Sequence, residues 1–404
     1  DLHTLIRAQT RPLAVRSSSR LEDALDHPFA GVYGTKMLPN NQPDSTTRFR
    51  RLVEAVKFVY GTTWMRAARS YHASLGGDLP PESMAVILQE VVGRRSGDHF
   101  HPDVSGVARS WNPYPFPGCE PEDGVVSLAL GLGRQIVDGG ASWTYAPRRP
   151  RVQPPWADVA DRARNTQTTF WAVNMGKPPA HDPTRETEYL VELDIAEAEK
   201  AGRAQNLLST WDTRNDRLRP GCIGPLGTPR VADFAPLLQY GDLPVTDAIV
   251  ALLDAAREAT GAEVELEFAM NFGARGDRSV RLSVLQVRPM AVHGSEVEVD
   301  EKELDDPRAV VASTSVLGDG DETLHDVVFV EPEGFDRSDT RAIAGELAEL
   351  NAGFVREGRP YVLIGFGRWG SSDPWLGIPV QWGDISGVRV LIEAASDELV
   401  ADPS

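Results

Sequence analysis

The first group of residues that could bind an anion is an arginine followed by three hydroxyl side chains, Arg16-Ser17-Ser18-Ser19. A guanidinium group presents a planar fork of donors that matches phosphate oxygens, and nearby hydroxyl and backbone N–H groups can complete the contact. A helix N-cap beside a surface arginine gives the same pattern, and for this segment alone it is the commoner interpretation. Arg16 is therefore a candidate phosphate ligand whose partners must come from elsewhere in the chain.

A second polar group comes from two strand-like runs, joined by a polar turn, between residues 264 and 290. Alternation along the first run places Glu265 and Glu267 on one face. If the runs pair as a hairpin, Gln286 and Arg288 add an amide and a guanidinium to that face. Carboxylate and amide oxygens suit Mg²⁺ and a guanidinium suits phosphate, so the group fits a metal-bridged triphosphate. An ordinary polar outer face of a sheet is the alternative.

Two weaker signals lie between these groups. Residues 130–140 are rich in glycine, and such turns let backbone N–H groups approach phosphates, although glycines also serve plain turns. His99 and His101 have the spacing of a metal pair on a strand. Without a third nearby ligand, exposed polar positions are the preferred interpretation, and we expect no zinc.

The C-terminal region has its own glycine-rich signature, GFGRWG at residues 365–370. A dinucleotide fingerprint needs a helix directly after such a turn, and two prolines within the next ten residues prevent one. A buried turn rich in glycine and tryptophan is the preferred interpretation. The alternative is a loop that binds an anion or a phosphoryl acceptor through Gly365, Gly367, Arg368 and backbone N–H groups.

The elements that must position these residues follow from apolar periodicity, which predicts a mixed α/β or α+β fold. We expect a larger domain over residues 1–292, an acidic linker over 293–306, a small α/β domain over 307–396 and a polar tail over 397–404. In the larger domain the apolar or strand-like runs are 12–15, 84–92, 125–132, 264–270 and 279–287, and the helices are 48–71 and 245–259. In the smaller domain the strands are 310–316, 326–330, 361–364 and 387–392, and the helix is 339–356.

Composition narrows the classes of partner. The formal net charge of −18 argues against binding to duplex nucleic acid, but a nucleotide needs only a few well-placed groups. No run approaches eighteen apolar residues, so we expect no membrane span. Two cysteines are too few for a disulfide framework and favour a reducing, cytoplasmic compartment. The first residues lack a methionine or a signal-peptide pattern, which suggests a processed end or the start of an ordered region.

Taken in order, these segments resemble the N-terminal nucleotide-binding domain of phosphoenolpyruvate synthase, pyruvate phosphate dikinase and rifampicin phosphotransferase. The resemblance runs from about Pro12 to Met290 and rests on VRSSS…ED…FAGVYGT, MAVILQEVV, SGVARSWNP, LALGLGRQIVDGG and VELEFA…LQVRPM. It implies an ATP-grasp-like fold, in which two α/β lobes clamp ATP between antiparallel sheets, with ATP and Mg²⁺ as cofactors. The C-terminal signature resembles that of bacterial proteins that join this domain to such a unit.

The resemblance also assigns roles to matching positions. Arg16 would contact the ATP phosphates, and Gly31 and Thr35 would line the phosphate end. The residues expected to read the adenine through backbone and side chain are Gln89, Glu90 and Val92.

At the other end of the domain, Glu267 and Gln286 would hold Mg²⁺ and Arg288 would bind the phosphate being transferred. Arg16 and Arg288 are therefore the expected catalytic residues. Glu265 lies one strand residue from the family's position and is a second choice.

Three departures from the family pattern bear on activity. The family's opening Gly-Gly-Lys segment is missing, since the sequence begins about fifteen residues before the RSS motif, so we expect the first lobe to be incomplete. Arg134 stands where the family's glycine loop usually has a glutamate. No Gly-Gly…Ser-His carrier segment follows Met290, and His293 and His325 lack the flanking residues.

The leading hypothesis is an ATP-dependent phosphotransferase. In the family a nucleophile attacks the β-phosphorus, which gives AMP and phosphate. Here the phosphoryl group would go to a histidine of a separate carrier chain or to a small acceptor near the Arg368 loop. The alternative is a non-catalytic nucleotide-sensing or scaffold module of a larger regulatory protein. The missing N-terminal segment of the same protein is a further expected partner. We predict that Glu267 and Gln286 lie on adjacent antiparallel strands and face Arg16, and that the 307–396 domain presents Arg368 to the same site.

Overall fold

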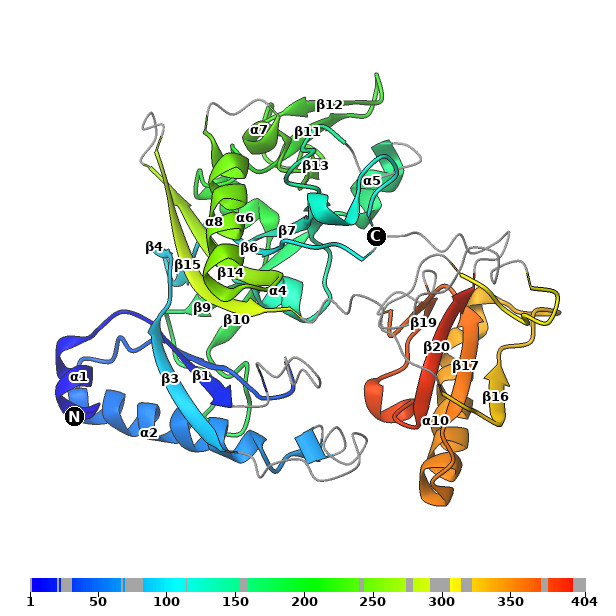
Figure 1. The fold of residues 1–404 in the computed structure, drawn as a ribbon. Coiled ribbons are helices and arrows are strands. Elements are labelled where there is room, and N and C mark those ends of the chain that lie inside the picture. Colours follow the sequence, from blue (N-terminus) through cyan, green and yellow to red (C-terminus); the bar gives the residue numbers. More distant parts are fainter. Residues whose placement is uncertain are drawn as a thin grey trace. The chain divides into compact units, whose positions relative to one another are not determined.

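The computed structural model describes residues 2–19, 22, 31–66, 68–69, 83–113, 115–152, 159–239, 243–273, 279–290, 306–313, 322–371 and 377–394. The chain divides into two compact units, which are described separately (Figure 1). The first unit comprises residues 1–63 and 82–291, and the second comprises residues 64–81 and 292–404. Each unit has its own hydrophobic core.

A three-stranded antiparallel sheet, here called the N-terminal sheet, begins the first unit. Its strands, in spatial order, are β2 (Lys36–Leu38), β1 (Leu13–Ser19) and β3 (Met84–Glu90). Helix α2 (Ser45–Thr62) packs on one face, and α1 (Leu2–Ala8) packs against α2. Leu13 and Val15 join the core beneath α2, so alternation directs Ala14 and Arg16 to the other face.

A five-stranded antiparallel sheet, here called the central sheet, forms the middle of the same unit. Its strands, in spatial order, are β15 (Val280–Pro289), β14 (Val264–Phe272), β6 (Val104–Arg109), β7 (Val125–Leu130) and β8 (Trp143–Tyr145). Helix α8 (Val245–Thr260) covers one face, where Leu266, Phe268 and Met270 are buried. A Cβ at Gly106 would lie 2.2 Å from the Phe268 ring, so only glycine fits there. The opposite face, here called the polar face, carries Arg109, Glu265 and Glu267.

Two smaller sheets and several short helices complete the first unit. One sheet has the order β10 (Leu190–Asp194), β9 (Thr169–Asn174), β5 (His99–His101), β4 (Arg94–Ser96), and the other β12 (Arg217–Pro220), β11 (Ser209–Asp212), β13 (Arg230–Val231). The short helices are η1 (Pro121–Asp123), α4 (Arg134–Val137), α5 (Val159–Asn165), α6 (Ile195–Lys200) and α7 (Ala235–Leu238). A buried cluster that includes Ala14, Leu132 and Val173 connects the N-terminal sheet with the glycine-rich turn and β9.

The second unit is built on a parallel sheet. Its strands, in spatial order, are β16 (Asp326–Phe329), β17 (Tyr361–Phe366) and β20 (Val388–Ala394). Helix α10 (Thr340–Glu357) connects β16 to β17 and buries Leu347 against Tyr361 and Leu363. The remaining short elements are η2 (Arg337–Asp339), β18 (Arg368–Trp369), β19 (Gly377–Ile378) and η3 (Trp382–Asp384).

The fold is mixed α/β, as the periodicity predicts, with two corrections. The helix expected over residues 48–71 ends at Thr62, where glycine and two threonines lower helix propensity. The strand expected over 310–316 is absent from residues 310–313, and residues 314–316 lie outside the described part. Val310 is 95% exposed, so its side chain is not buried as an apolar side chain of a sheet strand would be. Among the described residues, no helix combines the length and apolar character needed to cross a bilayer.

Candidate functional site

Arg16 joins the N-terminal sheet to the central sheet. Its Nη2 donates to Glu267 Oε2 at 3.0 Å and to Gln286 Oε1 at 2.5 Å. Its Nη1 donates to Gln89 Oε1 at 3.2 Å. The side chains of Arg16 and Glu267 are each about one-fifth exposed, at 21% and 23%. This ion pair is therefore partly shielded from water, where electrostatic interactions are stronger than at an open surface.

Gln89 provides a second connection between the same two sheets. It lies opposite Ala14 in the β1–β3 register, so its side chain shares the face of Arg16. Its Nε2 donates to the backbone carbonyl of Leu285 at 3.1 Å. Three of the residues predicted from different segments, Arg16, Gln89 and Gln286, are thus brought together with Glu267.

The predicted hairpin is confirmed as the pairing of β14 with β15. Glu267 lies directly opposite Gln286, and Glu265 lies directly opposite Arg288. Directly opposed residues of an antiparallel pair project from the same face, so all four side chains lie on the polar face of the central sheet. The predicted placement of Glu267 and Gln286 on adjacent antiparallel strands beside Arg16 is also confirmed.

A β-bulge sets the faces of this hairpin. The pairing skips between Glu267 and Phe268, so Leu285 is an extra residue on β15. Before the bulge, Leu282 packs against the hydrophobic core; after it, Gln286 and Arg288 face the polar side. With regular pairing Gln286 would fall opposite Leu266, a core residue. The bulge therefore re-aims the second half of the strand.

The oxygen atoms of Glu267 and Gln286 form a donor set that suits Mg²⁺. Both oxygens accept from one Nη2 atom of Arg16, so a cationic group already stands between them. A carboxylate and an amide oxygen are hard ligands of the kind that Mg²⁺ prefers. Among the described residues, no group of three or more His, Cys, Asp or Glu side chains is placed to hold a metal ion, so further ligands of a metal at Glu267 and Gln286 would come from a bound ligand or water.

Glu265 holds two arginines rather than a metal. Arg109 Nε donates to its Oε2 at 2.6 Å, and Arg288 Nε donates to its Oε1 at 2.8 Å. Burial raises the pKa of Glu265, but the two guanidinium groups lower it by more, so the net pKa is below the ordinary value. Sequence reasoning did not single out Arg109. It lies within the quoted SGVARSWNP segment, but only the β6–β14 register shows it opposite Glu265.

The two other residues expected at the adenine are placed differently from Gln89. Glu90 lies opposite Leu13 and faces the α2 side of the sheet, where Arg11 pairs with its carboxylate and Gln9 Nε2 donates to it at 2.7 Å. Val92 is half-buried in the segment after β3. The structure therefore does not bring the Glu90 side chain to Arg16, and a role for Glu90 would have to come from its backbone.

Thr35, one of the two phosphate-end candidates, lies next to an unexpected carboxylate. Gly31 is exposed with a φ of 73°, and the Thr35 N–H donates to Glu186 Oε1 at 3.2 Å. The same oxygen lies 3.2 Å from Arg134 Nη1, and Arg134 Nε lies 2.8 Å from Asp138 Oδ2. Arg134, which replaces the family's glutamate, thus finds its counter-charges within the chain. Residues 23–30 lie outside the described part, so Gly31 is the one residue of the FAG segment that the structure describes.

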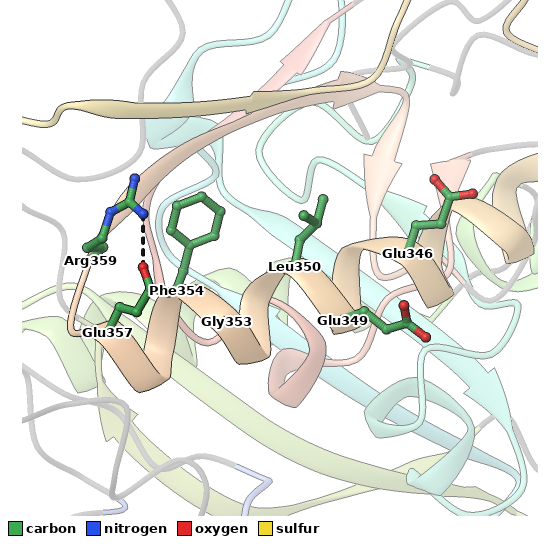
Figure 2. A pocket seen from close by; sticks show the side chains of 7 residues that line it. All are labelled: Glu346, Glu349, Leu350, Gly353, Phe354, Glu357 and Arg359. Carbon is green, nitrogen blue, oxygen red and sulfur yellow. Dashed lines mark hydrogen bonds and ion pairs between the residues drawn. The ribbon is translucent and has the colours of Figure 1, made fainter.

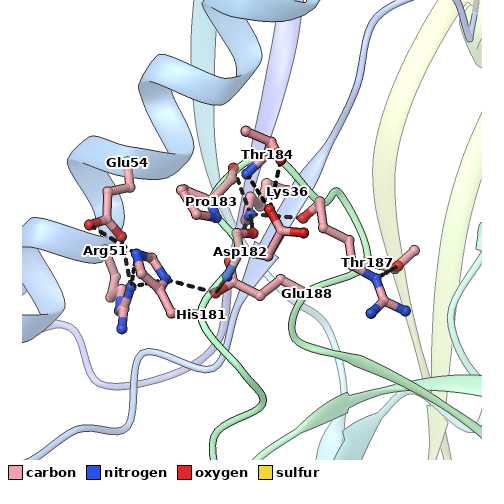
Figure 3. A network of polar contacts seen from close by, with 10 residues as sticks. Lys36, Arg51, Glu54, His181, Asp182, Pro183, Thr184, Thr187 and Glu188 are labelled. Carbon is pink, nitrogen blue, oxygen red and sulfur yellow. Dashed lines mark hydrogen bonds and ion pairs between the residues drawn. The ribbon is translucent and has the colours of Figure 1, made fainter.

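A buried lysine fixes the loop that carries Glu186 (Figure 3). Lys36 Nζ pairs with Glu188 Oε2 at 2.8 Å, and both side chains are at most 3% exposed. Nζ also donates to the carbonyls of Asp182, Pro183 and Arg185 at 3.2, 2.9 and 2.8 Å. Burial raises the pKa of Glu188, but the bonds from Lys36 and the Asp182 N–H lower it by more. No sequence signal distinguished Lys36 from a surface lysine.

His101 is a buried structural histidine. Its Nε2 lies 3.1 Å from Arg203 Nη1, its Nδ1 lies 2.7 Å from the Pro102 carbonyl, and its ring packs on Phe170. Burial, together with Arg203, lowers the pKa of His101 to about 4. The ring is therefore neutral at pH 7.

This buried histidine should make the first unit sensitive to acid. The unfolded chain takes up the His101 proton near pH 6.5 and the folded chain only near pH 4, so stability falls as pH falls through that window. We expect the wild-type free energy of unfolding to drop by about 2–3 kcal/mol more than that of His101→Gln between pH 7 and 4.5. Denaturant titrations across this range measure the difference, with His99→Gln as control. Parallel curves for wild type and His101→Gln would contradict the assignment.

The GFGRWG signature forms a packed turn in the second unit. β17 is followed by β18 and not by a helix, so the dinucleotide fingerprint is not built. A Cβ on Gly365 would lie 2.3 Å from the Trp369 ring, and Trp369 Nε1 donates to the Ile392 carbonyl at 3.2 Å. These contacts favour the structural interpretation of the glycines. A role of Gly367 and Arg368 toward an acceptor stays a prediction.

A pocket in the second unit lies along α10 (Figure 2). Leu350 and Phe354 form its apolar part, and Arg359 pairs with Glu357 at its end. The lining residues are Glu346, Glu349, Leu350, Gly353, Phe354, Glu357 and Arg359. Three glutamates against one arginine do not suit a phosphorylated ligand, so this pocket does not compete with the polar face of the central sheet.

Comparison with known proteins assigns the chain to a family. Over 138 residues it is 33% identical to the phosphoenolpyruvate synthase of Aeropyrum pernix, a match that covers 34% of this chain and 15% of that enzyme. Residues 2–309 match the family described as pyruvate phosphate dikinase, AMP/ATP-binding domain. The match includes both β1 and the β14–β15 hairpin, and thus every residue that meets at Arg16. The chain therefore belongs to the pyruvate phosphate dikinase AMP/ATP-binding domain family.

Proposed function

We propose that this chain binds Mg·ATP between the N-terminal sheet and the polar face of the central sheet, in an ATP-grasp-like arrangement, and transfers a phosphoryl group from it. The observation that carries the proposal is the meeting of Arg16 from one sheet with Glu267 and Gln286 from the other. Family membership supports the nucleotide, since the matched domain is an AMP/ATP-binding one.

On binding of Mg·ATP, the contacts of Arg16 with Glu267 and Gln286 would be replaced by contacts with the metal and the phosphates. Glu267 and Gln286 would hold Mg²⁺, which neutralises phosphate oxygens when bound. Arg16 would then move from these two oxygens to the phosphates, so each charged group exchanges one opposite charge for another. Arg16 and Arg288 would place two guanidinium groups on the phosphates, where they orient the reacting group and offset charge that develops during transfer.

The acceptor is either a histidine of a separate carrier chain or a small molecule. In either case we propose that the acceptor attacks the β-phosphorus and displaces AMP, which leaves a pyrophosphoryl group on the acceptor. Water then cleaves the bond to the terminal phosphorus, so phosphate is released and one phosphoryl group stays on the acceptor. The turn with Gly365, Gly367 and Arg368 is the proposed acceptor loop for direct transfer. Its backbone N–H groups and one guanidinium could bind an anionic acceptor.

Arg288→Ala tests the proposed site. Removing a charged phosphate contact costs roughly 1.5–3 kcal/mol, so we expect Mg·ATP to bind about ten- to a hundredfold more weakly. Isothermal calorimetry on the whole chain measures this, and Arg217→Ala is the matched control. Arg217 is exposed on β12, and its side chain makes no hydrogen bond or ion pair within the described residues.

The outcomes separate three possibilities. Weaker binding in Arg288→Ala, together with release of AMP by the wild type, supports the phosphotransferase. Equal affinities of wild type and Arg288→Ala would remove Arg288 from the site. Binding of Mg·ATP without AMP release, even when candidate acceptors are supplied, would favour the nucleotide-sensing module instead.

A further inference from the structure

Arg109 lies on the polar face of the central sheet, one strand further from β15. It ends β6, and the register places it directly opposite Glu265 on β14. The row formed by Arg288, Glu265 and Arg109 therefore crosses three adjacent strands. It lies two residues along the strands from Gln286 and Glu267, which corresponds to about 7 Å. A triphosphate bound at the Gln286–Glu267 pair is therefore long enough to reach Arg288 and Arg109.

The buried carboxylate of Glu265 does not need both arginines for its own neutralisation. Its side chain is 6% exposed. Arg288 directs both Nε and Nη2 to one oxygen, Oε1, and its guanidinium alone balances the charge of the carboxylate. Arg109 binds the other oxygen through Nε. A buried ion pair needs one counter-charge, so the second guanidinium gives this trio a net charge of +1.

The same excess holds for the five charged side chains that meet around Arg16 and Glu265. Arg16, Arg109 and Arg288 supply three positive charges against the two carboxylates of Glu265 and Glu267. The chain as a whole has a net charge of −18, so a face with a net positive charge stands out against its surroundings. Local positive charge on an acidic protein attracts an anionic ligand and raises its rate of association.

The Arg109 side chain is also placed to make new contacts. It is 48% exposed, more than Arg288 at 23%. Its Nε is anchored on Glu265, whereas no contact of its Nη atoms is recorded within the described residues. An anchored guanidinium loses less side-chain entropy on binding than a free one, and its outer N–H groups can still take phosphate oxygens.

We infer that Arg109 is a second phosphate-binding arginine of this site, which contacts the phosphates beyond the α-phosphate together with Arg288. Glu265 acts as a positioning residue that holds both guanidinium groups. This inference rests on the proposed function, because it requires that a nucleoside triphosphate occupies the polar face. It predicts that Arg109 contributes to the affinity for nucleoside triphosphates and not to the affinity for nucleoside monophosphates.

The test compares Arg109→Gln, Arg109→Lys and the control Arg217→Gln by calorimetry with Mg·ATP and with AMP. We expect Arg109→Gln to weaken Mg·ATP binding about ten- to a hundredfold, as for a lost charged contact. AMP affinity should change less than about twofold, since the monophosphate makes no contact to lose. Arg109→Lys should recover part of the Mg·ATP affinity, because a lysine keeps the charge but not the fork.

Three results would overturn the inference, and they are distinguishable. If the wild type binds neither ligand, the proposed function fails and this inference fails with it. If the wild type binds Mg·ATP and Arg109→Gln binds it equally well, only the role of Arg109 fails. If Arg109→Gln weakens Mg·ATP and AMP alike and lowers the melting temperature, Arg109 is a structural partner of Glu265 alone.

Discussion

Arg16→Ala should lower the affinity for Mg·ATP by at least about a hundredfold. The substitution removes a charged phosphate contact, which costs roughly 1.5–3 kcal/mol. It also removes the only described contacts of Glu267 and Gln286 with the N-terminal sheet. The two sheets would then be less well ordered before binding, and ordering them would cost further affinity. AMP release should fall with the affinity and by a further factor, because Arg16 would also stabilise charge during transfer.

Calorimetry and AMP release measured on the same preparations test this expectation. Arg16→Lys should be intermediate, because it keeps the charge without the planar fork. Arg50→Ala is the matched control, since Arg50 is exposed on α2 on the other side of the N-terminal sheet from Arg16. An Arg16→Ala protein that binds Mg·ATP as the wild type does would remove the central residue of the proposed site.

Lys36→Met should destabilise the first unit by about 3–5 kcal/mol, which is the cost of leaving one partner of a buried ion pair without the other. Glu188 would remain buried with its negative charge, and three backbone carbonyls would lose their donor. Urea denaturation followed in the first unit measures the loss. Lys57→Met, at an exposed position of α2, should change the free energy of unfolding by less than about 0.5 kcal/mol.

A double variant separates the ion pair from the packing of the lysine stem. Adding Glu188→Gln to Lys36→Met removes the uncompensated charge. The double variant should therefore lose clearly less free energy of unfolding than the two single variants lose in sum. Additive effects would mean that Lys36 and Glu188 act independently. A loss below about 1 kcal/mol for Lys36→Met would mean that the loop is held by other contacts.

Local patterns predicted much of the fold, because they report on which face of an element is buried. Strict alternation placed Glu265 and Glu267 on one face, and apolar spacing located α8 within one residue of its observed end. Arg16 was expected at the same site only through the family resemblance. It is 251 residues from Glu267, and no local pattern reports on contacts at that separation.

The features that the sequence did not predict are of two kinds. Some are contacts between residues far apart in the chain, and the others are residues that depart from the local pattern. Arg109 meets Glu265 across 156 residues, and Thr35 meets Glu186 across 151. A charged residue in a sequence is normally read as solvent-exposed, so Lys36 gave no sign that it is buried. The sequence shows Arg134 only as a replacement of the family's glutamate by a cation, because its partner Glu186 lies far away in the chain.

The bulge at Leu285 makes the pairing of Gln286 with Glu267 independent of the contact between the two sheets. Deleting Leu285 would pair Val284 with Phe268 and Gln286 with Glu267 as before, so the proposed metal ligands would keep their face. The deletion would, however, remove the carbonyl that accepts from Gln89. The extra residue thus supplies a carbonyl for the contact between the sheets, and the bulge accommodates it while Gln286 stays opposite Glu267. A change at this position would therefore alter the contact between the two sheets while leaving the proposed metal ligands opposite each other.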